Sequence, residues 1–132
     1  MTELDDTARR LAPAVAGIVP DEQVAQLRVR ELLRGLAIAA AMSGVLLPLS
    51  RELGDVWLAL LERPGLWREV APDAPELVDV RVVPSGEPAA LCVEWLACYL
   101  DRFGPLTADV VDYWPAARYL ADRGVDPTAV VA

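Results

Sequence analysis

The 132-residue sequence contains no histidine and no asparagine, and because all 12 of its basic residues are arginine it has no lysine either. These absences exclude a Ser-His-Asp triad, a Cys-His dyad, a histidine-ligated zinc, a Schiff-base lysine and the lysine of a phosphate-binding loop. Only carboxylates, tyrosine, cysteine and arginine are left for chemistry. The sequence therefore leans away from an enzyme, and it predicts no cofactor and no metal site.

Cysteine is also scarce, with only Cys92 and Cys98 in the whole chain. On a helix, six residues turn through about 600°, so the two side chains point to different faces and cannot form a disulfide. The acidic segment 1–6 lacks the positive charge of a targeting peptide. The longest apolar stretch, 35–50, is broken by a glycine and a proline and is shorter than the roughly 20 residues that span a bilayer. We therefore expect free thiols and a cytoplasmic protein.

The composition fits one folded domain over residues 1–132. Hydrophobic residues make up 55% of the chain, and 20 acidic against 12 basic residues give a net charge of −8. A chain of this length and apolar content can bury a core without disulfides. The negative charge argues against binding to nucleic acid or to an anionic membrane, and it suits a protein partner with a basic surface.

Hydrophobic spacing predicts a mainly α fold, a compact bundle of five to six helices. The first helix would carry an apolar stripe with intervals of three and four residues, made by Leu4, Ala8, Leu11, Val15 and Ile18. Later helices are expected over 50–62 (capped by Ser50), 89–103, 107–113 and 116–123, the last ending at Gly124.

The longest predicted helix begins after Asp21, a candidate N-cap. Its first half, to Arg34, is amphipathic, with glutamines and arginines facing water, among them Gln23, Gln26, Arg30 and Arg34. Its second half, 36–42, is apolar on every side. Such a helix must enter the core, or a partner, along its length.

A change of period predicts one small β element. Val78, Val80 and Val82 alternate with polar residues, as in a strand with one wet face. Residues 66–70 could be the pairing strand, which would give a two-stranded β-ribbon around residues 66–83. A lone ribbon is marginally stable, so we expect it to lie on helices or to pair between subunits.

Two groups of residues are candidates for a site. Glu94 lies within an otherwise apolar turn, where burial would raise its pKa and could make it an acid or base, although it could equally lie on an exposed strip. The last third of the chain also holds most of the aromatic residues. A ligand pocket could be built from Trp95, Tyr99, Tyr113, Trp114, Cys92 and Arg102, but the same rings could simply fill the core.

The segment 102–110, Arg-Phe-Gly-Pro-Leu-Thr-Ala-Asp-Val, resembles the opening of a winged-helix DNA-binding domain. That resemblance implies a recognition helix and a basic wing further along. The stretch from Thr107 to Gly124 is too short for two full helices, and it carries several aspartates. The leading hypothesis is therefore a non-enzymatic interaction or accessory protein, such as an inhibitor subunit of antitoxin or immunity type. It would bind a protein partner or a second copy. The alternative is a small-molecule-binding protein or small enzyme of secondary metabolism that takes an apolar ligand, and a DNA-binding regulator ranks third.

Overall fold

The structure is a computed structural model, and it describes residues 3–41, 45–46, 49–70, 81–82 and 89–128. Most of these residues are helical, which confirms the mainly α prediction. The helices are α1 (Glu3–Leu11), the 3-10 turn η1 (Ala12–Val15), α2 (Glu22–Ala41), α3 (Arg51–Leu61), α4 (Pro64–Val70), α5 (Ala89–Phe103), α6 (Ala108–Val111) and α7 (Pro115–Ala121). None of the helices in these ranges is long and apolar enough to cross a membrane.

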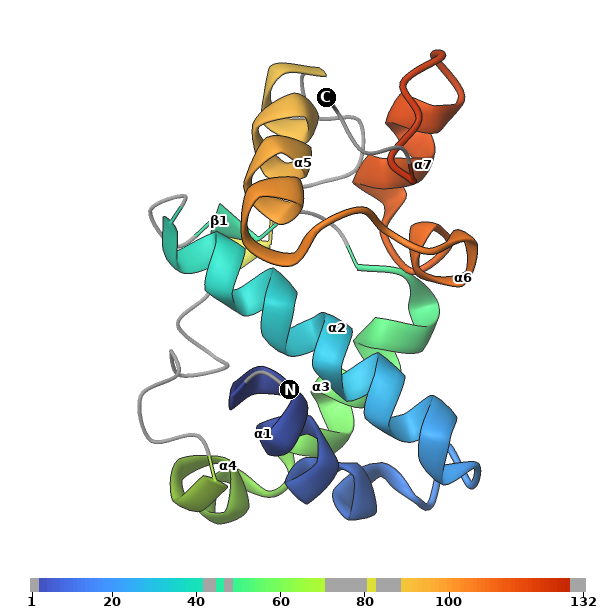
Figure 1. Ribbon diagram of the computed structural model, residues 1–132. Coiled ribbons are helices and arrows are strands. Elements are labelled where there is room, and N and C mark those ends of the chain that lie inside the picture. Colours follow the sequence, from blue (N-terminus) through green and yellow to red (C-terminus); the bar gives the residue numbers. More distant parts are fainter. Residues whose placement is uncertain (1–2, 42–44, 47–48, 71–80, 83–88, 129–132) are drawn as a thin grey trace.

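Helix α2 runs diagonally through the molecule, between α1 on one side and α5 on the other (Figure 1). It begins where the sequence predicts, because the Asp21 side chain accepts a hydrogen bond of 3.1 Å from the backbone N–H of Val24. In the apolar second half, Leu36, Ile38 and Ala39 are at most 1% exposed, whereas Ala41 at the end of the helix is exposed. The three buried residues enter the core of their own chain, so they are not available to a partner.

The first helix is shorter than its apolar stripe predicts. Ala8, Leu11 and Val15 are buried as expected, but Ile18 is 51% exposed. Pro13 lies in η1, where the chain tightens into a 3-10 turn. A 3-10 helix has about three residues per turn instead of 3.6, so the apolar stripe does not continue along the buried face beyond η1. The Ile18 side chain therefore faces solvent.

The predicted two-stranded β-ribbon is not found among the ribbon residues that the structure describes, 66–70 and 81–82. Residues 66–70, the proposed first strand, belong to helix α4, which begins at Pro64, a residue favoured in the first turn of a helix. The two short strands, β1 (Val45–Leu46) and β2 (Arg81–Val82), instead pair with each other in parallel. The remaining ribbon positions, 71–80 and 83, lie outside the described residues.

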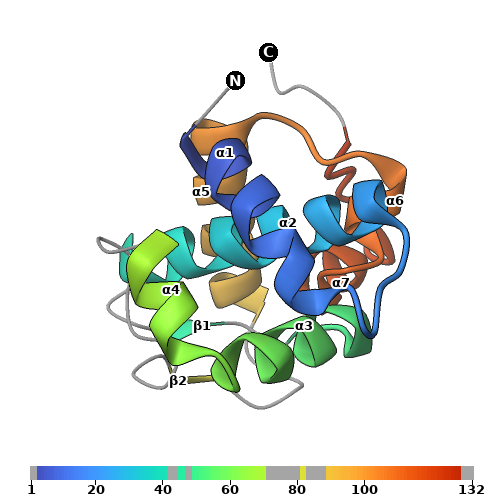
Figure 2. The ribbon, with the colours of Figure 1, turned by 90° about the horizontal axis from the view of Figure 1, so that it is seen from below.

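The other helices assemble around α2. Figure 2 shows α1 crossing α2, with α3 and α4 along one edge and α6 and α7 at the far end. A backbone hydrogen bond of 3.2 Å from Ser50 N to Tyr113 O ties the C-terminal part to the segment before α3. Within the C-terminal part, Leu106 N donates to Pro127 O at 3.1 Å. The largest fully buried side chains, Trp95, Trp114 and Tyr99, come from α5 and from the residue before α7, and two of them, Tyr99 and Trp114, bind α2 through Glu31.

Candidate functional site

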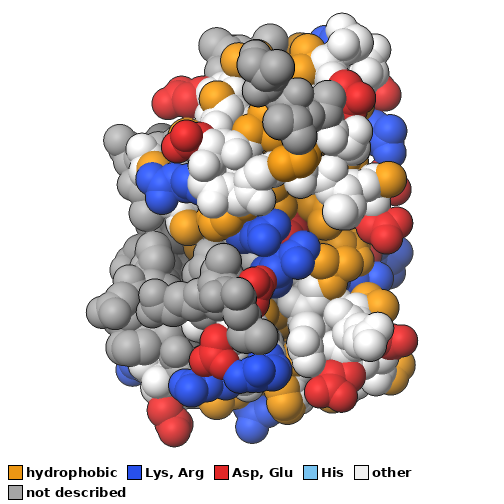
Figure 3. Space-filling model, viewed as in Figure 1, with side chains coloured by type: hydrophobic (Ala, Val, Ile, Leu, Met, Phe, Trp, Pro, Cys, Tyr) orange, Lys and Arg blue, Asp and Glu red, His pale blue; other side chains and the backbone are white. Residues whose placement is uncertain are grey.

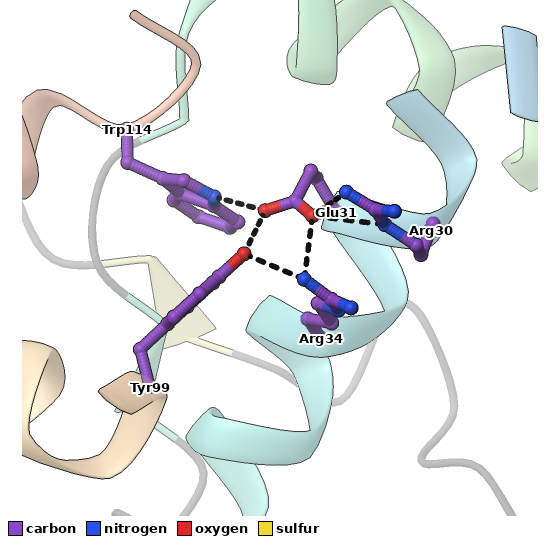
Figure 4. A network of polar contacts seen from close by, with 5 residues as sticks. All are labelled: Arg30, Glu31, Arg34, Tyr99 and Trp114. Carbon is purple, nitrogen blue, oxygen red and sulfur yellow. Dashed lines mark hydrogen bonds and ion pairs between the residues drawn. The ribbon is translucent and has the colours of Figure 1, made fainter. Parts of the chain in front are cut away.

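Glu31, in the middle of α2, is the one charged side chain that is fully buried among the described residues. Its Oε1 accepts hydrogen bonds from the Tyr99 hydroxyl at 2.6 Å and from Trp114 Nε1 at 3.2 Å. Its Oε2 accepts from Arg30 Nε at 3.2 Å and Nη2 at 3.1 Å, and from Arg34 Nη1 at 3.3 Å. Figure 4 shows this Glu31 network, the side chains of residues 30, 31, 34, 99 and 114.

Three separate parts of the chain supply the Glu31 network. Glu31 and the two arginines come from α2, Tyr99 comes from α5, and Trp114 precedes α7. Trp114 reaches α2 because Gly35, one turn beyond Glu31, has no side chain. An added Cβ at position 35 would lie within 2.9 Å of Cζ2 of the Trp114 ring. The glycine in mid-helix is thus a requirement of this close approach.

Arg34 closes the network on the α5 side. Its Nη1 donates to the Tyr99 hydroxyl at 2.9 Å as well as to Glu31, and the same hydroxyl donates to Glu31. The guanidinium also lies over the Phe103 ring, 4.8 Å from its centroid. Only 14% of the Arg34 side chain is exposed. The cation is therefore held by both a carboxylate and an aromatic face.

Electrostatics keeps Tyr99 protonated. Burial raises the pKa of the Tyr99 hydroxyl well above its usual value, and the charge and hydrogen bond of Glu31 raise it further. Arg34 lowers this pKa, but by less. A phenol in this state donates a hydrogen bond to Glu31 and does not act as a base near neutral pH.

The Glu31 carboxylate has little capacity left for chemistry. Five hydrogen bonds from Tyr99, Trp114 and the two arginines reach its oxygens. A carboxylate offers about four lone-pair positions, so these donors saturate it. A general base needs a free lone pair beside a substrate. The arrangement is typical of a polar contact that fixes the relative positions of packed elements.

The aromatic residues predicted to line a pocket are partly brought together. Trp95 lies 5.2 Å from Trp114 and 5.4 Å from Tyr99, centroid to centroid, and all three rings are buried. They fill the space between α2, α5 and α7 by contact with one another. Tyr113 lies apart from them, half-buried, and its hydroxyl accepts a hydrogen bond of 3.2 Å from Arg28 Nε.

The charged residues predicted for the same pocket do not join these rings. Glu94 and Arg102 are exposed on α5, whereas Trp95 and Tyr99 point into the core. Cys92 is buried and Cys98 half-buried, and neither forms a disulfide. The carboxylate beside the rings is therefore Glu31 and not Glu94.

Sequence reasoning missed Glu31 because its surroundings on α2 look solvated. Arg30 and Arg34 were expected to face water, but both are half-buried and bind Glu31. A signal is present in hindsight. One glutamate lies between two arginines and one turn before Gly35, on the stretch that leads into the apolar half of the helix.

A groove of about 520 Å³ lies between α1 and the first half of α2. Its lining is mixed in polarity: Asp5, Ala8, Gln23, Gln26, Leu27 and Arg30. Arg30 links the groove to the Glu31 network, because it lines the groove and also binds Glu31. Figure 3 shows basic side chains gathered where α2 crosses the middle of the molecular face.

Comparisons of the chain with protein-family models, curated proteins and solved structures find no match. Within the described ranges, no three His, Cys, Asp or Glu side chains come together in a way that could hold a metal ion. Function must therefore be inferred from the Glu31 network, the groove and the exposed surface.

Proposed function

We propose that this chain is a non-enzymatic interaction or accessory protein of the cytoplasm, which binds a protein partner or a second copy of itself. The observation that carries the proposal is the saturation of the Glu31 carboxylate by donors from its own chain. The most deeply buried acid of the described residues is thereby committed to holding α2, α5 and the segment before α7 together.

The outer surface supports the binding part of the proposal. Large apolar side chains are exposed on several elements, with Leu58 of α3 at 63% and Val93 of α5 at 53%. Single exposed apolar residues are common, so none of them alone defines an interface. The net charge of −8 favours a partner whose contact surface is basic.

Size-exclusion chromatography with light scattering tests this proposal. The purified chain is first run alone over a range of concentrations. A fluorescently labelled sample is then run in lysate of the native source, with and without excess unlabelled chain. We expect a dimer or a larger species of defined mass, the latter reversed by the unlabelled competitor. A monomer at all concentrations that also elutes unchanged from lysate would overturn the proposal.

The alternative, a small-molecule protein built on the aromatic residues, ranks second. A ligand there would have to separate the Trp95 ring from the rings of Tyr99 and Trp114, which it already contacts. The DNA-binding regulator ranks third. Helices α6 and α7 have four and seven residues, which is short for a recognition helix in the major groove.

A further inference from the structure

We infer that the groove between α1 and α2 is a binding site for a small zwitterion of the amino-acid type. Arg30 would receive the ligand's carboxylate, Asp5 its ammonium group, and Leu27 and Ala8 its apolar side chain. This site would add a small ligand to the partner binding proposed above.

The size and lining of the groove suit such a ligand. Its volume of about 520 Å³ falls within the range of roughly 300–1,000 Å³ that small-molecule sites occupy. One cationic and one anionic side chain line the same groove, with two glutamines and two apolar residues. A ligand with one charge of each sign matches this lining, and because it is neutral overall the net charge of the protein does not repel it.

Arg30 is held in place for this role by a buried partner. Its Nε and Nη2 both donate to Glu31 Oε2, at 3.2 and 3.1 Å, so one edge of the guanidinium is fixed. An arginine has five N–H donors, and no further hydrogen bond of Arg30 is found among the described residues. The side chain remains 27% exposed. Donors that are fixed before the ligand arrives bind it with less loss of entropy.

The local charge also favours an anion at Arg30. Arg30 and Arg34 together carry two positive charges against the single negative charge of Glu31. The Glu31 network as a whole therefore carries one unit of positive charge, and Arg30 is the member of it that lines the groove. Arginine and carboxylate form paired, charge-assisted hydrogen bonds that are about twice as strong as neutral ones.

The ammonium end of the ligand would be received by Asp5, a half-buried residue of α1. A carboxylate has about four lone-pair positions, so Asp5 can accept from the ligand in addition to its contact within the chain. Gln26 Nε2 donates to Glu22 at 3.4 Å, and its side-chain carbonyl can accept a second ammonium proton.

Three leucine derivatives separate the contributions of the two charges. L-leucine has both charges, N-acetyl-leucine lacks the ammonium group, and leucinamide lacks the carboxylate. Each is titrated into the ¹⁵N-labelled chain to about 10 mM, which detects millimolar dissociation constants. We expect leucine to shift the signals of Gln23, Gln26 and Leu27 saturably. The other two should bind at least about tenfold more weakly, because each loses one charge-assisted contact. Leucyl-glycine, with more widely spaced charges, is a second zwitterionic probe.

Variants test whether the groove residues Asp5 and Arg30 bind leucine. Asp5→Asn leaves the Glu31 network intact, and it should weaken leucine binding while leaving the affinity for N-acetyl-leucine unchanged. Arg30→Gln should abolish the effect of leucine, and a circular dichroism spectrum will show whether that variant is folded. Arg51→Gln, on the exposed surface of α3, removes the same charge and should bind like the wild type.

If neither leucine nor leucyl-glycine shifts the signals of Gln23, Gln26 and Leu27, the inference is overturned. Equal affinity for leucine and either singly charged derivative would also overturn it, because recognition would then not require both charges. Neither result would affect the light-scattering test of partner binding.

Discussion

The ring of Trp114 occupies the space that a side chain at position 35 would need. A Cβ added to Gly35 would lie within 2.9 Å of Cζ2 of that ring and closer still to Cη2. Glycine in a helix is destabilising by about 0.5–1 kcal/mol relative to alanine. In this chain that penalty is offset by a buried ring and by its hydrogen bond to Glu31.

Gly35→Ala should therefore destabilise the protein, by about 1–2 kcal/mol, because overpacking costs more than the gain in helix propensity. Urea unfolding followed by circular dichroism measures the change. The matched control is Gly54→Ala on α3, where nothing lies within 4 Å of the added Cβ. That substitution should stabilise the protein by about 0.5–1 kcal/mol. The same chemical change should therefore raise the free energy of unfolding at position 54 and lower it at position 35. The same sign in both would contradict the contact between Gly35 and Trp114.

Glu31→Gln should lower the free energy of unfolding by about 2–4 kcal/mol. It removes the charge that two half-buried arginines bind, and breaking one side of a buried ion pair is strongly destabilising. Glu94→Gln, the same change on the exposed side of α5, should stay within about 0.5 kcal/mol of the wild type. Chemical denaturation measures both. A larger loss of stability for Glu94→Gln than for Glu31→Gln would show that the fold depends on the Glu94 carboxylate and not on that of Glu31.

The raised pKa of Tyr99 predicts a loss of stability in alkali. In the folded state this hydroxyl keeps its proton above the ordinary tyrosine pKa, because it is buried and beside Glu31. The stabilising contribution is complete below a pH of about 10, the unfolded pKa, and is lost as the pH rises from there towards the folded value.

Tyr99→Phe should be less stable than the wild type at neutral pH, by about 1–2 kcal/mol, and should lose less stability above pH 10. The urea midpoints of Tyr99→Phe and of the wild type, each measured across this pH range, should approach each other as the pH rises. Tyr119→Phe, whose hydroxyl lies outside the Glu31 network, is the control and should keep the wild-type slope. Parallel curves for Tyr99→Phe and wild type would contradict the linkage.

The two thiols should differ in reactivity. Cys98 is half-buried on α5, whereas Cys92 is 6% exposed on the same helix. Pulsed alkylation of the native chain followed by peptide mapping should therefore modify Cys98 at least about tenfold faster, because Cys92 requires local opening. Equal rates would show that α5 does not hold Cys92 in the core.

Local signals predicted much of the helical framework. The caps at Asp21 and Ser50 are both made by the expected side chains, to Val24 N at 3.1 Å and Leu53 N at 3.3 Å. Gly104 and Gly124 follow helices with positive φ angles of 81° and 89°, as their positions in the sequence indicate. Such features depend on neighbours within a few residues, which a sequence displays directly.

The Glu31 network could not be predicted in the same way. Tyr99 and Trp114 are 68 and 83 residues away from Glu31 along the chain. Whether a glutamate on an amphipathic helix is solvated or buried is decided by these distant partners. The segment 66–70 was wrongly predicted as a strand because five residues, two of them charged, are too few to distinguish a helical from a strand period. Its structure follows from Pro64 and from the packing of α4 against α1 and α3.

The Glu31 network also has an evolutionary consequence. A carboxylate with donors from two distant segments cannot be lost alone without leaving buried groups unpaired. In homologous chains, positions 31, 99 and 114 should therefore vary as a set, and a side chain should appear at position 35 only where the tryptophan has become smaller. This covariation would identify relatives whose overall sequence identity is too low to reveal them.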